Sequence, residues 1–214
     1  MRCHKAAIKS KRGGMTMVGY KRALAFALGV AAVPAIAQLA GSDGEAFVAA
    51  LKEGNGSKAV ELVEKPGSTV VNYRGGDGNA GLHIAMRNRN GNWVGFLLSR
   101  DADPNVADKN GDTPLILAAR LGYPEGAARM LMARAQVDKA NRLGETALIV
   151  AVQQRQAAIV RMLLEAGANP DKADHASGYS ARDYAKRDNR TTEILRLIES
   201  VKVKKAATVG PVRP

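Results

Sequence analysis

The sequence predicts an all-α fold, a solenoid in which short helix-turn-helix units stack on one another. Two observations favour this fold. Residues 108–140 hold two apolar segments, 116–120 and 127–133, which Gly122 separates. The same pattern returns along the chain at a period of 33 residues. Because isolated helices of two to three turns are marginal in water, each unit must bury its apolar face against its neighbours.

Local signals within 108–140 place the helix ends. Pro114 suits the first turn of a helix, where a missing N–H costs nothing. Thr113 precedes it and is a candidate N-cap. Gly122 can adopt the left-handed conformation that ends a short helix. The unit is therefore predicted to contain a turn at 110–112, a helix, a second turn and a second helix.

The period rests on several positions rather than on one motif. Four of them recur in three successive units: Gly78, Gly111 and Gly144; Leu82, Leu115 and Leu148; Ala85, Ala118 and Ala151; Leu98, Leu131 and Leu164. Residues 113–118 read TPLILA, with LHIA at 82–85 and TALIVA at 146–151. From about Gly44 to Ser200 the chain resembles the ankyrin repeat family, whose signature includes T-P-L-H-x-A. The resemblance implies an ankyrin-type solenoid with β-turn or hairpin tips along one edge.

Residues 1–37 are expected to be upstream residues and a cleaved signal peptide. Lys21 and Arg22 precede an apolar run at 23–33, and Ala35-Ile36-Ala37 is a small-residue cleavage pattern. An apolar run of 11 residues is short for a bilayer span, which needs about 20. We therefore expect cleavage near Ala37 and no stable membrane insertion afterwards; an uncleaved anchor and a buried helix are the alternatives. Residues 1–14 lie upstream of an ordinary signal.

The remaining chain divides by the repeat period. Residues 38–74 are predicted to form a lead at 41–44 and an N-terminal capping repeat, with helices at 45–53 and 57–64 and Ser57 as an N-cap. Full repeats follow at 75–107, 108–140 and 141–173. Residues 174–200 form a C-terminal capping repeat, in which Arg182 and Glu193 replace residues that face a next repeat. The basic tail, 201–214, is expected to be disordered.

Four positions depart from the glycine that the repeat favours. Arg89 and Arg155 stand where Gly122 ends its helix, and Asp101 and Arg134 stand where Gly167 does. Residues other than glycine are uncommon in the left-handed region. Strained backbone is therefore predicted at these four residues.

Two motifs imitate ligand sites. Residues 76–81, GDGNAG, match a dinucleotide-binding turn and follow a strand-like stretch at 69–73, but no strand–helix–strand unit surrounds them. Residues 101–112 begin like a calcium loop, but Val106 and Asp112 stand where that loop needs glycine and glutamate. Both are interpreted as repeat turns, and no cofactor is expected.

The composition offers no catalytic or metal centre. The only cysteine, Cys3, precedes the predicted cleavage site, and the part beyond that site holds two histidines. His83 occupies the family's Leu-His position, where the resemblance implies a hydrogen bond to a neighbouring turn. No triad or metal cluster can be assembled from these pieces, so the protein is predicted not to be an enzyme. Trp93 is expected in the core, with an exposed anchor as the alternative.

The net charge of +12 does not indicate nucleic-acid binding. Lys and Arg number seven in 1–37 and four in 201–214, and neither segment carries an acidic residue. Residues 38–200 hold 21 basic against 20 acidic residues. The folded part is almost neutral, so no nucleic-acid partner is expected.

The resemblance places function on the concave face formed by turn tips and first helices. Its variable contact positions fall on Asp77, Asn79, Arg87, Asn88, Lys109, Asn110, Asp112, Arg120, Leu121, Arg142, Leu143, Glu145, Gln153 and Gln154. We expect a monomeric, periplasmic or secreted module that binds a protein partner, with an acidic surface as the fitting chemistry. The alternative is a small-molecule or polyanion receptor that uses Arg87, Lys109, Arg120 and Arg142.

Overall fold

The computed structural model describes the backbone of residues 33–208 and the side chains of residues 43–200. The chain divides into two units, Met1–Ala37 and Gln38–Pro214, and the second contains the repeats. Residues 1–32, with most of the predicted signal peptide, lie outside the described residues, as do residues 209–214.

Within the described residues the chain is helical and contains no named strand. The helices are α1 (Val33–Glu53), α2 (Gly56–Glu64), η1 (Val70–Asn72), α3 (Gly81–Arg87), α4 (Gly91–Ser99), α5 (Pro114–Leu121), α6 (Pro124–Met132), α7 (Ala147–Gln153), α8 (Ala157–Glu165), α9 (Ala181–Arg187), η2 (Asn189–Thr191) and α10 (Thr192–Thr208). The predicted all-α solenoid of stacked helix-turn-helix repeats is confirmed.

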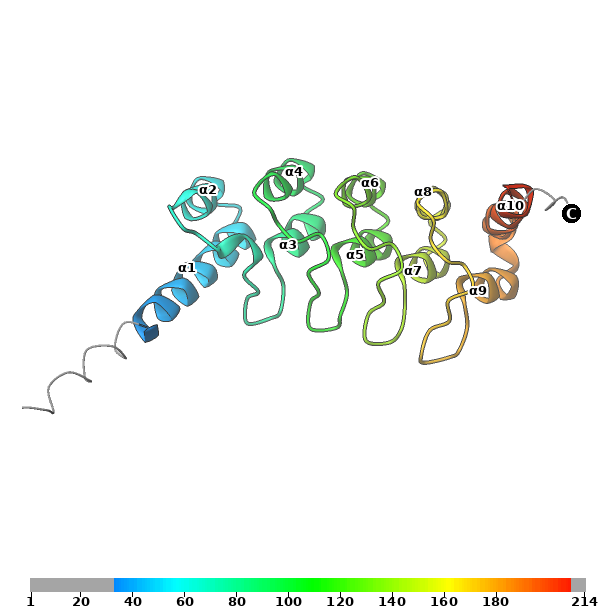
Figure 1. The fold of residues 1–214 in the computed structure, drawn as a ribbon, viewed down its shortest axis with the longest axis horizontal. Helices are drawn as coiled ribbons and strands as arrows, with labels where there is room; N and C mark the ends of the chain where they lie inside the picture. Colours follow the sequence, from blue (N-terminus) through cyan, green and yellow to red (C-terminus); the bar gives the residue numbers. More distant parts are fainter. Residues whose placement is uncertain (1–32, 209–214) are drawn as a thin grey trace, which may run out of the picture. The chain divides into compact units, whose positions relative to one another are not determined.

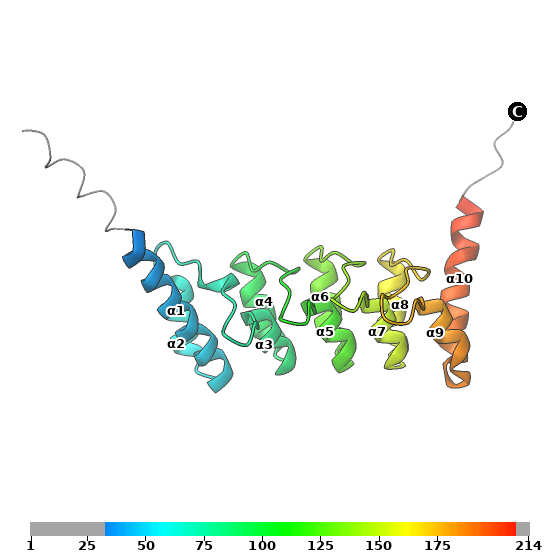
Figure 2. The same cartoon turned by 90° about the horizontal axis from the view of Figure 1, so that it is seen from below.

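The helices of the repeats form two rows. Figure 1 shows the first helices α3, α5, α7 and α9 in one row and the second helices α4, α6, α8 and α10 in the other. Long turns project from the row of first helices, and Figure 2 shows successive helix pairs side by side in chain order. Each repeat therefore contacts the repeats before and after it, as in other stacked arrays.

Side-chain caps fix where the first helices begin. Thr113 accepts a hydrogen bond from the Ile116 amide at 3.2 Å, and Thr146 accepts one from the Ile149 amide at 3.3 Å. Each cap satisfies one of the amides that a helix start leaves without a partner. Gly122 ends α5 in the left-handed region, at φ 58°. The predicted cap and helix end of the 108–140 unit are both confirmed.

The four predicted strained positions are confirmed. In the described residues, the non-glycine residues with positive φ are Arg89 (49°), Asp101 (60°), Arg134 (57°) and Arg155 (55°). Each of them ends a helix of its repeat, where the chain must turn sharply. The backbone conformation is therefore set by the repeat, and the side chain at that position tolerates it.

The core lies between the helices of successive repeats. Leu115 and Leu148 are almost fully buried, as is Leu164, which is 5% exposed. Leu131, at the same repeat position as Leu164, is half-buried, and its neighbour Met130 occupies the fully buried position of α6. Trp93 is half-buried and packs edge-on against Phe96, with ring centroids 5.2 Å apart.

The N-terminal cap differs from the sequence prediction in two ways. Asn55, not Ser57, caps α2, and its side-chain oxygen accepts the Lys58 amide at 3.1 Å. The predicted lead at 41–44 is part of the continuous helix α1. Gly44 belongs there because any Cβ at that position would collide with the ring of Tyr73.

The C-terminal end also departs from the prediction. Arg182 is buried rather than solvent-facing, and its Nε donates at 2.6 Å to the carboxylate of Asp171 in the preceding repeat, so its charge is paired. Glu193 is exposed, as expected for a residue with no further repeat to cover it. Helix α10 ends at Thr208 and so includes residues 201–208 of the segment that the sequence analysis assigned to the tail.

Candidate functional site

The turns that project from the first helices share one internal design. At the start of successive turns stand Asp108, Asn141 and Asp174, and a side-chain oxygen of each accepts two backbone amides of its own turn. The distances run from 2.7 to 3.1 Å. This side-chain bonding is the one that stabilises tight turns in general. It holds the tips in a fixed conformation.

Neighbouring turns are also bonded to one another. The Arg142 amide donates to the Asn110 carbonyl at 3.0 Å, and the His175 amide donates to the Leu143 carbonyl at 2.8 Å. Buried His83 joins its helix to the following turn, since its Nε2 lies 3.0 Å from the carbonyl oxygen of Asp112. The row of turns is therefore a preformed surface that needs little ordering on binding.

A groove lies between two of these turns and the first helices beside them, with a volume of about 580 Å³. We call it the turn groove. It is lined by Arg87, Asp108, Lys109, Asn110, Asp112, Leu117, Arg120, Leu121, Asn141, Arg142 and Leu143. These residues come from three consecutive repeats, so the groove exists only when the repeats stack.

The floor of the groove is a network of compensated charges. The carboxylate of Asp112 is almost buried and accepts bonds from Arg120 at 3.1 Å and from the Asn141 amide group at 2.8 Å. Glu145 accepts from Asn141 at 2.9 Å and lies 3.5 Å from the Arg120 guanidinium. Buried carboxylates need such partners, because desolvation of an unpaired charge is costly.

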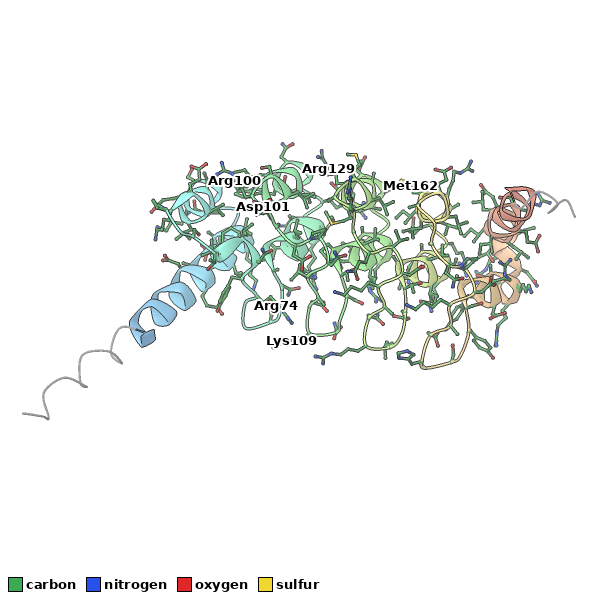
Figure 3. The ribbon with its side chains drawn as sticks, in the orientation of Figure 1. Arg74, Arg100, Asp101, Lys109, Arg129 and Met162 are labelled. Atoms are coloured by element: carbon green, nitrogen blue, oxygen red, sulfur yellow. The ribbon has the colours of Figure 1, made fainter. Side chains whose placement is uncertain are left out.

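The four cations of the expected basic strip are not equivalent. Arg120 belongs to the network just described, and Arg87 contacts Asn79 at 3.2 Å and Asp108 at 3.9 Å. In the described part of the chain, Lys109 and Arg142 have exposed side chains with no hydrogen bond or ion pair. Figure 3 shows Lys109 at the end of its turn, away from the second helices. Of these four cations, Lys109 and Arg142 are the two that offer uncompensated positive charge to a ligand.

An exposed apolar side chain lies next to these cations. Leu143 is 56% exposed, whereas Leu117 on the groove floor is 5% exposed. Exposed leucines are ordinary when they stand alone. Here the leucine forms part of a groove wall and follows a free cation directly in the sequence. The wall thus combines charge with an apolar contact.

The structure brings eight of the fourteen predicted contact residues together. They are Arg87, Lys109, Asn110, Asp112, Arg120, Leu121, Arg142 and Leu143. The other six do not line the groove. Asp77 pairs with Lys52 of α1 at 2.7 Å, Asn79 binds Arg87, and Glu145 binds Asn141 and Arg120. Asn88, Gln153 and Gln154 lie at the ends of α3 and α7.

The sequence prediction missed three lining residues, Asp108, Leu117 and Asn141. Two of them carried a usable signal, because Asp108, Asn141 and Asp174 recur at the 33-residue period with a side-chain oxygen acceptor each time. Such residues start turns by bonding to amides two or more positions ahead. Leu117 carried no signal beyond its place in an apolar helix.

The motifs that imitated ligand sites serve the repeat instead. The stretch before residues 76–81 is the 3₁₀ helix η1, not a strand, so the dinucleotide-binding context is missing. In the second motif, the side chain of Asn105 accepts the amide of Gln136 in the next repeat at 2.7 Å. Asn72 and Asp138 make the same contact one repeat earlier and later. These side chains link neighbouring repeats.

The described residues contain neither a recognisable metal site nor a membrane-spanning helix. No group of three or more His, Cys, Asp and Glu residues there could hold a metal ion. No helix there combines the length and the apolar character of a membrane span.

The chain is similar to segments of several larger proteins. It is 30% identical over 140 residues to a Danio rerio protein named as a palmitoyltransferase, ZDHHC13. The aligned segment is 64% of this chain and 21% of that protein. It is 34% identical over 91 residues to a Caenorhabditis elegans homologue of transient receptor potential cation channel subfamily A member 1. This alignment covers 42% of this chain and 7% of the channel. It is 30% identical over 109 residues to the Arabidopsis thaliana E3 ubiquitin-protein ligase KEG. This alignment covers 50% of this chain and 7% of the ligase. The chain thus spans about a fifth or less of these relatives.

A family model assigns the repeats directly. The model described as "Ankyrin repeats (3 copies)" matches residues 46–140 and 82–174, which together exceed half of the chain. Ankyrin repeats generally mediate protein–protein interaction and are typically non-catalytic. The period, the paired helices, the projecting turns and this match agree, and the chain belongs to the ankyrin repeat family.

Proposed function

We propose that this protein is a non-catalytic module that binds a partner protein through the turn groove. The supporting observation is the groove wall itself, where uncompensated Lys109 and Arg142 occur together with exposed Leu143 above a rigid floor. Charged residues at such a surface steer association, and an apolar contact holds the complex. An acidic protein surface with apolar side chains is the partner chemistry that fits.

The charge distribution favours a protein over a polyanion or an anionic small molecule. Arg87 and Arg120 are already paired with carboxylates, and the almost buried carboxylates of Asp108 and Asp112 are among the groups that line the groove. A multiply charged anion would have to displace these pairs or lie against the acids. A polyanion receptor needs all four cations free, and two of them are not.

The proposal includes export of the protein, as a monomer, from the cytoplasm of a bacterium to the periplasm. It is motivated by the positive start, the short apolar run and the Ala35-Ile36-Ala37 pattern in residues 15–38. Mass spectrometry of the exported chain should give an N-terminus at Gln38. Retention of residues 15–37 in a membrane fraction would contradict cleavage, and light scattering of the purified protein tests the monomer.

Capture of a partner from periplasmic extract tests the binding function. The purified protein should retain one stoichiometric protein, and the Lys109→Glu/Arg142→Glu variant should retain it at least about tenfold more weakly, a loss of about 1.4 kcal/mol. The Arg161→Glu/Arg196→Glu variant makes the same charge change on exposed second-helix residues and should bind as wild type. Salt-sensitive retention of nucleic acid or polysaccharide without a protein would support the receptor alternative. Equal capture by both variants would remove the groove as the site.

A further inference from the structure

Three basic residues occupy one position in three consecutive turns. Lys109, Arg142 and His175 follow one another at the 33-residue period. We call them the turn ladder. Each rests on the turn glycine of the preceding repeat: a Cβ on that glycine would lie 2.5 Å from Cγ of Lys109, 3.1 Å from Cγ of Arg142 and 2.7 Å from Cγ of His175.

The glycines that carry the ladder fix its geometry. Gly78, Gly111 and Gly144 all have a φ of 81°, a conformation that disfavours side chains. The three basic residues therefore begin from equivalent backbone positions. Because packed helices lie about 8–10 Å apart, equivalent residues of adjacent repeats are separated by roughly that distance.

The ladder side chains are available to a ligand. All three are exposed, and in the part of the chain that the structure describes their side chains form no hydrogen bond or ion pair. The acidic groups of the same turns are committed elsewhere: Asp108, Asp112 and Asp174 are each 5% exposed. The outer edge of the turns therefore presents basic groups in a line, with the acids behind them.

Apolar side chains accompany the ladder at its C-terminal half. Leu143 lies between Arg142 and the turn of His175, whose amide binds the Leu143 carbonyl at 2.8 Å. Tyr179, on that same last turn, is 36% exposed and packs edge-on against Tyr184 at 5.7 Å. Arg187 stacks over the Tyr179 ring at 4.4 Å. A ligand on the ladder therefore meets apolar surface as well as charge.

We propose that the turn ladder binds an extended acidic segment of the partner protein in the polyproline II conformation, with acidic residues at every third position and an apolar residue beside them. This deepens the proposed function and rests on it. A polyproline II segment has three residues per turn and a rise of about 3.1 Å, so every third side chain shares a face at about 9 Å intervals. A β-strand places i and i+3 on opposite faces, and its same-face spacings of about 7 and 13 Å miss the ladder.

The test measures binding of fluorescein-labelled peptides to the full chain by anisotropy. The probe has glutamates at i, i+3 and i+6, one leucine, and prolines that hold the extended conformation. The matched peptide has the same composition with its glutamates adjacent. We expect the spaced peptide to bind about tenfold more tightly, since several exposed ion pairs together give a modest gain. Arg142→Ala should remove most of this preference, and Arg161→Ala should leave it intact.

Four outcomes would overturn the inference: equal binding of the two peptides, binding of neither, a preference that survives Arg142→Ala, or tighter binding of a helical peptide with glutamates at i and i+7. Effective competition by a sulfated polysaccharide at the peptide's own concentration would also count against it. These results are separable from the proposed function, because partner capture that is lost in Lys109→Glu/Arg142→Glu would still identify the groove as a protein-binding site.

Discussion

The Nε2 atom of buried His83 lies 3.0 Å from the backbone carbonyl oxygen of Asp112, which belongs to the turn of the following repeat. The other ring nitrogen, Nδ1, accepts the Ala80 amide at 3.2 Å. With Nδ1 as the acceptor, Nε2 carries the proton and donates to Asp112. One neutral imidazole therefore satisfies the start of α3 and fixes the position of the groove-lining turn.

This arrangement predicts a pH dependence of stability. Burial lowers the pKa of His83 below its ordinary value of 6.5, against smaller contributions from the Asp112 carbonyl and Asp108 that raise it; Arg87 and Arg74 lower it further. The unfolded chain therefore binds a proton at a higher pH than the folded chain does. The free energy of unfolding should fall as pH drops below 6.5, by at most about 1.4 kcal/mol per pH unit for one proton.

Urea unfolding between about pH 4.5 and 6.5, above the range of ordinary carboxylates, measures this slope. His83→Gln is the control, because glutamine cannot gain a proton in that range and its slope should be smaller. His83→Ala should lower the free energy of unfolding by about 1–3 kcal/mol at neutral pH, since it leaves buried backbone groups without partners. Identical slopes for wild type and His83→Gln would show that another group titrates.

Two adjacent residues of α6 give a test of the packing. Met130 is fully buried and Leu131 is half-buried. Met130→Ala should cost about 2–5 kcal/mol of unfolding free energy, as large-to-small core changes do. Leu131→Ala should cost clearly less. Equal losses would mean that Leu131 is the true core residue.

Hydrogen exchange extends the same test to the stacking. Coupling in repeat arrays acts between nearest neighbours. Met130→Ala should therefore reduce protection in 75–107 and 141–173 before it does so in 45–64 or 181–200. Full protection of both flanking repeats would contradict the model of stacked repeats.

The residues with left-handed backbone permit a matched pair of substitutions by glycine, one that should stabilise the protein and one that should not. Arg134 is exposed and its side chain makes no hydrogen bond or ion pair within the described residues, so Arg134→Gly should relieve its backbone and raise stability by about 0.5–1 kcal/mol. Arg89 also has a positive φ, but its guanidinium donates to the carbonyl oxygens of Leu121 and Gly122. Arg89→Gly should give no gain, because it removes this link between repeats. Thermal melts of the two variants compare them directly.

These residues also show what the sequence could predict. The period identified the repeats and, by alignment with Gly122 and Gly167, all four left-handed positions, because backbone conformation repeats with the architecture. It could not predict that Arg89 reaches the next repeat, since that depends on a side-chain path in three dimensions. Gly44 was assigned to a flexible lead because its requirement comes from the ring of Tyr73, which is distant in sequence.

The turn groove likewise has features that the sequence could predict and features that it could not. Eight lining residues followed from the contact positions that the resemblance to the ankyrin family implies, and Asp108 and Asn141 could have followed from their recurrence as turn-starting acceptors. What the sequence could not supply was the pairing of charges. Arg120 and Arg142 both line the groove, yet in the described residues the first is bound to Asp112 and the second has no ion pair.

That difference gives the last prediction. Arg120→Gln should lower the free energy of unfolding by about 1–3 kcal/mol, because it removes charged hydrogen bonds from Asp112, whose side chain is 7% exposed. Since the Arg120 side chain is itself 39% exposed, water will replace part of the loss and the lower half of that range is the expectation. Arg142→Gln removes the same charge from the same groove and should leave stability within about 0.5 kcal/mol of wild type.

The Asp112→Asn/Arg120→Gln double variant should lose less than the two single changes added together, because each residue is the other's partner. Urea denaturation of the wild type, Asp112→Asn, Arg120→Gln and the double variant gives the coupling energy directly. A coupling energy near zero, or an Arg142→Gln loss equal to that of Arg120→Gln, would mean that Arg120 is as free to meet a ligand as Arg142, and the preference for a protein partner over a polyanion would lose its basis.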